Sequence, residues 1–125
     1  MTDERQELGK IGENLAADAL SRQGYTILVR NYRCRYGEID IIGKVRDTLA
    51  FIEVKTRRSH LYGLPEDAVT MRKQRQIIKS AQHYLAEHNL FDHDCRFDVV
   101  SVIIDERKPA KISIIAGAFD LSSTW

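Results

Sequence analysis

The apolar residues of the chain recur at helical spacing in two long segments. The first helix is predicted from about Asp3 to Gln23, because apolar residues return every three or four positions and Gly24 then ends the pattern. The second is predicted from about Thr70 to His88. Its expected buried stripe consists of Ile77, Ile78, Ala81, Tyr84 and Leu85. Both helices should pack an apolar face on another layer.

Five shorter apolar runs are typical of strands: Tyr25 to about Arg30, Glu38 to Gly43, Thr48 to Thr56, Cys95 to Ile104 and Lys111 to Ala116. The connections are predicted to be a basic loop at 31–37, a hairpin turn at 44–47, a loop at 57–67 and a turn at 105–111. A right-handed crossover through the second helix would make the third and fourth strands parallel. The order α-β-β-β-α-β-β therefore predicts an α/β sandwich: a mixed β-sheet with flanking helices.

The composition is that of one ordinary globular domain over residues 1–125. Hydrophobic residues make up 43% of the chain and charged residues 30%. No apolar run reaches the roughly 18 residues of a membrane helix, and the first residues lack a secretory signal. We therefore expect a cytoplasmic protein with no membrane partner. Cys34 and Cys95 lack the spacing of a zinc site, and we expect both to be reduced thiols.

The charges are unevenly distributed, although the net charge is only +1. From Lys55 to Lys79 there are seven basic residues and two acidic ones. A second basic cluster consists of Arg30, Arg33 and Arg35, and it is interleaved with Tyr32 and Tyr36. The acids gather mainly before residue 20 and between Asp92 and Glu106. This distribution could produce one basic face that meets a polyanion.

Two carboxylates interrupt the apolar strands of the predicted hairpin. If residues 46–47 form the tip, Asp40 lies opposite Glu53, and Glu38 lies opposite Lys55. A tip of odd length would shift this register. Opposed carboxylates destabilise a sheet unless they share a proton or meet positive charge. A hard divalent cation such as Mg²⁺ explains the nearby lysine better than a shared proton does.

Each of these residues has an ordinary explanation when it is taken alone. A carboxylate in a strand usually faces solvent, and Glu13 could be the polar flank of an amphipathic helix. Lys55 could be a surface lysine, and Arg57 and Arg58 could be solvated loop charges. The combination of Asp, twelve residues and then Glu-x-Lys, after a helix that carries a glutamate, favours a functional site.

The motifs Gly12-Glu13, Gly24-Tyr25, Gly37-Glu38-Ile39-Asp40, Phe51-Ile52-Glu53-Val54-Lys55-Thr56-Arg57 and Arg96-Phe97-Asp98 resemble the YraN family of small bacterial proteins. That family is placed in the PD-(D/E)xK nuclease superfamily, which includes archaeal Holliday-junction resolvases. The resemblance runs from about Gln6 to Phe119. It implies a restriction-endonuclease-like three-layer sandwich. Ile39 stands where the name of the superfamily calls for proline.

The resemblance also implies a set of site residues. Asp40 and Glu53 would ligate Mg²⁺ or Mn²⁺, together with the backbone carbonyl of Val54. Glu13 would be an additional acidic ligand. Lys55 would orient or activate the attacking water, or stabilise charge on the phosphate.

The expected activity is metal-dependent hydrolysis of phosphodiester bonds, structure-selective for branched or junction DNA and favouring DNA over RNA. Backbone phosphates would be held by Arg30, Arg33, Arg35, Arg57, Arg58, Arg72, Lys73 and Arg75. Junction-resolving relatives imply a homodimer. A non-catalytic nucleic-acid-binding or adaptor domain remains the main alternative. An enzyme for small phosphorylated molecules ranks lower, because the chain has no glycine-rich phosphate loop.

Overall fold

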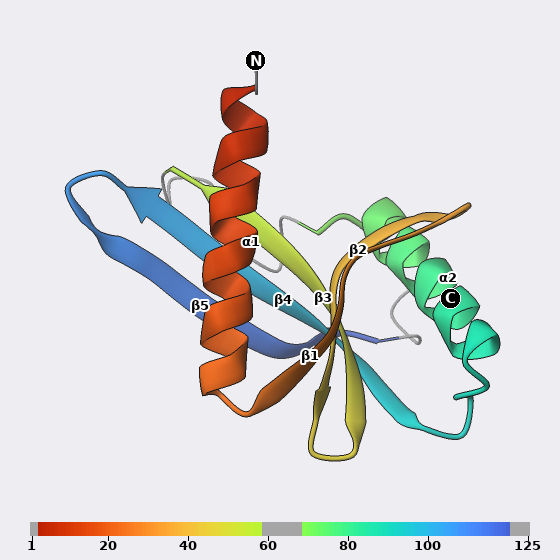
Figure 1. The fold of residues 1–125 in the computed structure, drawn as a ribbon. Helices are drawn as coiled ribbons and strands as arrows, with labels where there is room; N and C mark the ends of the chain where they lie inside the picture. Colours follow the sequence, from red (N-terminus) through yellow and green to blue (C-terminus); the bar gives the residue numbers. More distant parts are fainter. Residues whose placement is uncertain (1–2, 59–68, 121–125) are drawn as a thin grey trace.

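The computed structural model describes residues 3–58 and 69–120 and contains one five-stranded sheet with two helices (Figure 1). The elements are α1 (Glu4–Arg22), β1 (Tyr25–Cys34), β2 (Gly37–Val45), β3 (Thr48–Arg57), α2 (Met71–Glu87), β4 (Asp94–Asp105) and β5 (Lys108–Phe119). The strands are ordered β1-β2-β3-β4-β5. Only β3 and β4 are parallel, so the sheet is mixed. The predicted α/β class and element order are confirmed.

The helix ends follow from local capping. The side chain of Asp3 accepts the N–H of Arg5 at 3.1 Å, and that of Thr70 accepts the N–H of Lys73 at 3.2 Å. Gly24, with φ 92, adopts the left-handed conformation just after α1. The two predicted helices are therefore confirmed to within one residue at each end. Neither helix is long and apolar enough to cross a membrane.

The helices cover opposite faces of the sheet. Side chains alternate along β3, so Phe51 packs with Ile77 and Tyr84 of α2, whereas Ile52 packs with Leu20 of α1. The other members of the α2-side core include Ile42, Leu49, Ile78, Leu85, Phe97 and Val99. Those of the α1-side core include Ala16, Ile41, Ala50, Val100 and Val102. The fold therefore has three layers.

Two connections are shorter than predicted. The basic segment expected to be a loop at 31–37 is largely strand, because β1 continues to Cys34 and pairs with β2 up to Gly37. The turn expected at 105–111 contains only residues 106 and 107, because β5 begins at Lys108. In both cases the backbone hydrogen bonds of an antiparallel ribbon hold segments whose side chains carry little apolar signal. The loop predicted at 57–67 lies mostly outside the described residues.

The ribbon of β1 and β2 changes direction at Asn31, whose φ is 56. Residues two apart in a regular strand share a face. Here, however, Arg30 contacts Glu13 of α1, whereas the Tyr32 ring packs on Tyr84 of α2 with centroids 5.3 Å apart. Figure 1 shows the far ends of β1 and β2 bending toward α2. The left-handed residue therefore turns the end of the ribbon from one face of the sheet to the other.

Two glycines allow close approaches that position this region. A Cβ at Gly12 would lie 1.8 Å from Oγ1 of Thr56, so α1 touches β3 at that point. A Cβ at Gly37 would lie 2.0 Å from Nε2 of Gln76, and its φ is 137. The first contact holds α1, which carries Glu13, close against β3. The second brings the end of the ribbon against α2.

Candidate functional site

The hairpin that carries the two carboxylates has the predicted tip at residues 46–47. Its strands pair from Val45 with Thr48 to Ile41 with Ile52. The ladder stops at that point, one residue short of the acids. The turn and its register are confirmed, but the expected continuation of the ladder through the acids is wrong.

Asp40 makes a different contact with β3. Its Oδ2 accepts the backbone N–H of Val54 at 2.8 Å, so a side chain replaces the ladder there. Its neighbour Ile39 belongs to the α2-side core and Ile41 to the α1-side core. Asp40 thus lies where the ribbon passes from one face to the other. This position lets it respond to charges on both helices.

The two carboxylates are electrostatically linked. Burial, together with the negative charges of Glu13 and Glu38, raises the pKa of Asp40 to about 6, although the hydrogen bond from Val54 acts in the opposite direction. Glu53 is 6% exposed; burial and then the charge of Asp40 raise its pKa to about 7. Near neutral pH, the pair therefore gains stability from a proton or from nearby positive charge.

Positive charge reaches the pair from two elements. Lys73 on α2 lowers the pKa of both acids, and Lys55 on β3 lowers that of Glu53. The sequence singled out Lys55 for this role and assigned Lys73 only to nucleic-acid binding. The crossover that brings α2 over the sheet leaves no short-range motif, so this second lysine could not be recognised from spacing.

Glu13 is held by β1 above this region. Its side chain is 14% exposed, and its Oε1 accepts from Arg30 Nε and Asn31 Nδ2, each at 3.1 Å. Arg30 also donates to Oδ1 of Asn14 at 2.7 Å. Asn14 and Asn31 were not among the predicted site residues. An asparagine within a polar strand could have indicated the left-handed backbone, because Asn tolerates that conformation well.

A hollow of about 910 Å³ joins these groups on the α1 side of the sheet. Its charged lining residues are Arg5, Lys10, Glu13, Arg30, Arg33, Glu38, Asp40 and Lys55. Val54 also lines it, as the resemblance implied, whereas Glu53 does not. Within residues 3–58 and 69–120, no group of three or more His, Cys, Asp or Glu side chains is close enough to form a metal site. Ligation by Glu13 and by the carbonyl of Val54 stays a prediction.

The predicted phosphate-binding residues divide between several surfaces. Arg30 and Arg33 line the hollow beside Asp40, and Arg33 also contacts Glu38 at 3.2 Å. Arg58 contacts Glu4 at 2.7 Å and a second acid, Glu106, at 3.7 Å. Arg57 is half-buried in the last position of β3, and Arg75 is exposed on α2.

A smaller hollow of about 490 Å³ lies at the start of α2 and is lined by Tyr36, Thr70, Arg72, Lys73 and Gln76. The Tyr36 ring is 36% exposed, and the Arg35 guanidinium lies 4.8 Å from its centroid. Tyr32 instead packs on α2 and donates its hydroxyl to Glu87. Exposed aromatic rings can stack on unpaired bases, and of Tyr32 and Tyr36 the latter is the accessible one.

These observations define an α/β protein with a half-buried and a buried acid close together, lysines from two elements and an arginine-bearing hollow. Carboxylate oxygens are the ligands that Mg²⁺ and Mn²⁺ prefer, so the donor chemistry of Asp40 and Glu53 fits such an ion. The surrounding guanidinium and ammonium groups can hold phosphate. The arrangement can thus bring a hard cation and a phosphodiester together.

The chain belongs to the uncharacterised protein family UPF0102, whose sequence profile matches residues 12–102. It is 49% identical over 118 residues to a UPF0102 protein of Trichlorobacter lovleyi, covering 94% of this chain and 93% of the relative. A UPF0102 protein of Caldicellulosiruptor bescii is 47% identical over 116 residues, with coverages of 91% and 98%. The crystal structure of SSO0001 gives a TM-score of 0.41 at 22% identity. The match covers 98% of this chain and 56% of that one, so this chain spans about half its length.

Proposed function

We propose that the protein is a metal-dependent endonuclease with a restriction-endonuclease-like site, acting on branched or junction DNA in preference to RNA. The observation that carries the proposal is the pair of half-buried Asp40 and buried Glu53, whose pKa values are raised by burial and then by neighbouring negative charge. A cation would stabilise that pair. The basic hollow beside Asp40 would receive the phosphodiester.

In this proposal Mg²⁺ or Mn²⁺ is held by Asp40 and Glu53, with Glu13 and the carbonyl of Val54 as further donors. When bound, such an ion supplies Lewis-acid polarisation of the phosphate and a more acidic water. Lys55 orients that water or stabilises charge on the phosphate. By family resemblance, attack is in line and leaves a 5′-phosphate.

In this proposal the substrate is bound by residues that contact its sugar-phosphate backbone and do not recognise its sequence. Arg30 and Arg33 lie in the same hollow as Asp40, and Arg72 and Lys73 line the hollow beside Tyr36. Contacts of this kind favour substrates by shape and charge. A cytoplasmic location and a homodimer complete the proposal, both as expectations from the sequence.

The proposal is tested by nicking assays on linear, flapped and four-way DNA with Mg²⁺ or Mn²⁺. Asp40→Asn and Glu53→Gln should abolish cleavage. Lys55→Met should lower the rate about 100-fold, a magnitude typical for the loss of one charge-stabilising group. Lys44→Met removes an exposed strand lysine and serves as the matched control, with an unchanged rate. Equal cleavage by wild type and Asp40→Asn would refute the assignment.

The second candidate is a nucleic-acid-binding adaptor without turnover. It is favoured by the contacts of Glu13, whose Oε1 is engaged by Arg30 and Asn31. Wild-type protein that binds junction DNA but cleaves nothing in either metal would establish this alternative. In both cases affinity should fall steeply with salt, because phosphate contacts release counterions. An affinity independent of salt would exclude nucleic acid as the partner.

A further inference from the structure

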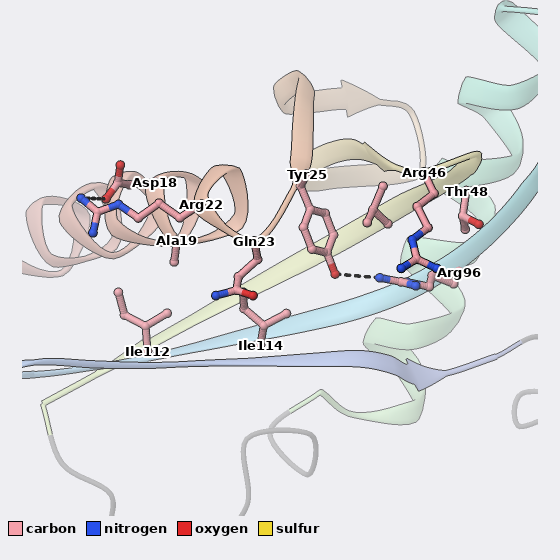
Figure 2. Close-up of a pocket in the computed structure, with 11 residues that line it drawn as sticks. Asp18, Ala19, Arg22, Gln23, Tyr25, Arg46, Thr48, Arg96, Ile112 and Ile114 are labelled. Carbon is pink, nitrogen blue, oxygen red and sulfur yellow. Dashed lines mark hydrogen bonds and ion pairs between the residues drawn. The ribbon is translucent and has the colours of Figure 1, made fainter.

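A second large hollow, of about 850 Å³, lies at the C-terminal end of α1 (Figure 2). The hollow beside Asp40 instead runs along the first half of that helix. The second hollow lies beside the last turn of α1, which ends at Arg22. We call it the arginine hollow. It is lined by Asp18, Ala19, Arg22, Gln23, Tyr25, Val45, Arg46, Thr48, Arg96, Ile112 and Ile114.

Arg96 is held rigidly in this hollow. Its Nε donates to both carboxylate oxygens of Asp98, at 3.1 and 3.2 Å, and its Nη2 donates to the Tyr25 hydroxyl at 2.8 Å. That hydroxyl donates in turn to Oδ2 of Asp98, also at 2.8 Å. Asp98 is fully buried, whereas the side chain of Arg96 is 34% exposed. Nη1 makes no hydrogen bond to the described residues, so a fixed guanidinium keeps one edge open to the hollow.

Arg46, at the tip of the β2–β3 hairpin, points to the same place. Its φ of 54 is a left-handed conformation that costs energy in a residue other than glycine. It has no hydrogen bond or ion pair with any residue in the described part of the chain. Figure 2 shows Arg46, Arg96 and Tyr25 gathered at one end of the hollow. Two guanidinium groups that face one space repel each other, and an anion between them removes that repulsion.

The remaining charges of the hollow leave it positive. Arg22 contacts Asp18 at 3.1 Å, and both side chains are largely exposed. The hollow is lined by three arginines and one acid, Asp18, and a second acid, Asp98, lies beneath it. The net charge of these side chains is therefore +1. Ile112 and Ile114 supply an apolar floor. The volume is within the range of about 300–1,000 Å³ that is usual for small-molecule sites.

We propose that the arginine hollow binds a phosphate monoester. The phosphate lies between Arg46 and Arg96, where arginine can make paired, charge-assisted hydrogen bonds. The attached organic group rests on Ile112 and Ile114. A free nucleoside 5′-phosphate and the 5′-phosphorylated end of a nucleic-acid strand offer this same chemistry. The inference is independent of the proposed nuclease activity, because the arginine hollow shares no residue with the hollow beside Asp40 or with the pair Asp40 and Glu53.

The test is a titration of the ¹⁵N-labelled chain, followed by amide chemical shifts, without divalent cations. The ligands are inorganic phosphate, adenosine 5′-monophosphate, and one oligonucleotide with and without a 5′-phosphate. Arg46→Gln should weaken binding of the monophosphate about tenfold or more, the usual effect of losing a charged hydrogen bond. Arg107→Gln changes an exposed arginine in the β4–β5 turn and is the matched control.

Arg46→Gly provides a second, independent variant. Glycine accepts the left-handed conformation, so the unfolding temperature should equal or exceed that of wild type while monophosphate binding is lost. Such a result excludes misfolding as the cause of the lost binding.

The expected shifts fall at residues 22–25, 45–48 and 112–114. Tighter binding of the monophosphate than of inorganic phosphate identifies a free nucleotide as the source. Selective binding of the 5′-phosphorylated oligonucleotide identifies a strand end. The proposal is overturned if no ligand saturates these signals, if the shifts gather around residues 13, 30 and 40 instead, or if Arg46→Gly binds like wild type.

Discussion

Replacing Asp40 by Asn should make the folded chain more stable in mildly alkaline solution and leave it nearly unchanged in acid. The reason is the raised pKa of both Asp40 and Glu53. The folded state holds protons between the ordinary pKa values and about 6 to 7, where the unfolded state has released them. The free energy of unfolding of wild type therefore falls as pH rises through this window and is constant above it.

The magnitude follows from the Asp40 carboxyl alone. A rise from 3.8 to about 6 is worth about 3 kcal/mol at roughly 1.4 kcal/mol per pKa unit. Partial exposure of Asp40 reduces this to about 2 kcal/mol. Asn carries no charge and can still accept the N–H of Val54 through its carbonyl oxygen. The variant therefore avoids the free-energy cost of an ionised carboxylate and keeps the hydrogen bond. Removing the Asp40 charge should also lower the pKa of Glu53.

The assay is urea unfolding, followed by far-UV circular dichroism at about pH 4 and about pH 8. At the higher pH the midpoint of Asp40→Asn should exceed that of wild type by about 1 M urea, given a typical slope of about 1–3 kcal/mol per molar. Asp47→Asn, at the exposed hairpin tip, controls for the loss of one carboxylate.

The charged groups around the pair from each packed element are Glu13, Glu38, Lys55 and Lys73. Adding Mn²⁺ at the higher pH should raise the stability of wild type by about 3 kcal/mol at 100 times its dissociation constant, and should not affect Asp40→Asn. Parallel pH profiles for wild type and Asp40→Asn would refute the argument about the buried pair. A normal pH difference without any effect of Mn²⁺ would refute only the metal.

Two further predictions concern the surroundings of the site. Gly12→Ala should destabilise the chain by about 1–3 kcal/mol in thermal unfolding, because the added Cβ would clash with Thr56. At Gly9 an added Cβ would contact nothing, so Gly9→Ala should stabilise the chain by about 0.5–1 kcal/mol. Equal effects of the two substitutions would contradict the close approach of α1 to β3. Tyr36→Ala should weaken binding of single-stranded DNA about tenfold in fluorescence anisotropy, and Tyr36→Phe should not, because one stacked base contributes about 1–3 kcal/mol. Tyr32→Phe is the control. A loss of affinity in Tyr32→Phe but not in Tyr36→Ala would contradict the stacking role of Tyr36.

The sequence predicted those parts of the fold that depend on side-chain periodicity. Both helices have capping residues at their starts and a regular apolar stripe, so their ends were placed within one residue. The outer part of β1 was not predicted beyond Arg30, since it is polar and is held by backbone pairing with β2. Backbone hydrogen bonding leaves no pattern in residue type, and such strands are therefore underestimated.

The site shows the same division between pattern and geometry. The predicted turn and register are confirmed from Val45–Thr48 to Ile41–Ile52, but the predicted pairs Asp40–Glu53 and Glu38–Lys55 do not form. The pattern could not indicate that the ladder stops at Ile41, because residue types alone do not record where backbone pairing ends. Nor could it place Lys73, which reaches the acids only through the packing of α2.

This departure from regular geometry bears on the function. Had the ladder continued, the Val54 N–H would have been available to a backbone carbonyl of β2, and Asp40 would have extended from one face only. Instead the Asp40 side chain replaces the backbone contact at 2.8 Å and stands between the α1-side and α2-side cores. The carboxylate is fixed in position and remains at the rim of the hollow beside α1. At this half-buried position, a side chain that only accepted the backbone N–H would be more stable as a neutral group such as Asn. An acid that is held rigidly, with its pKa raised and lysines from two elements around it, is suited to exchange its proton for a cation.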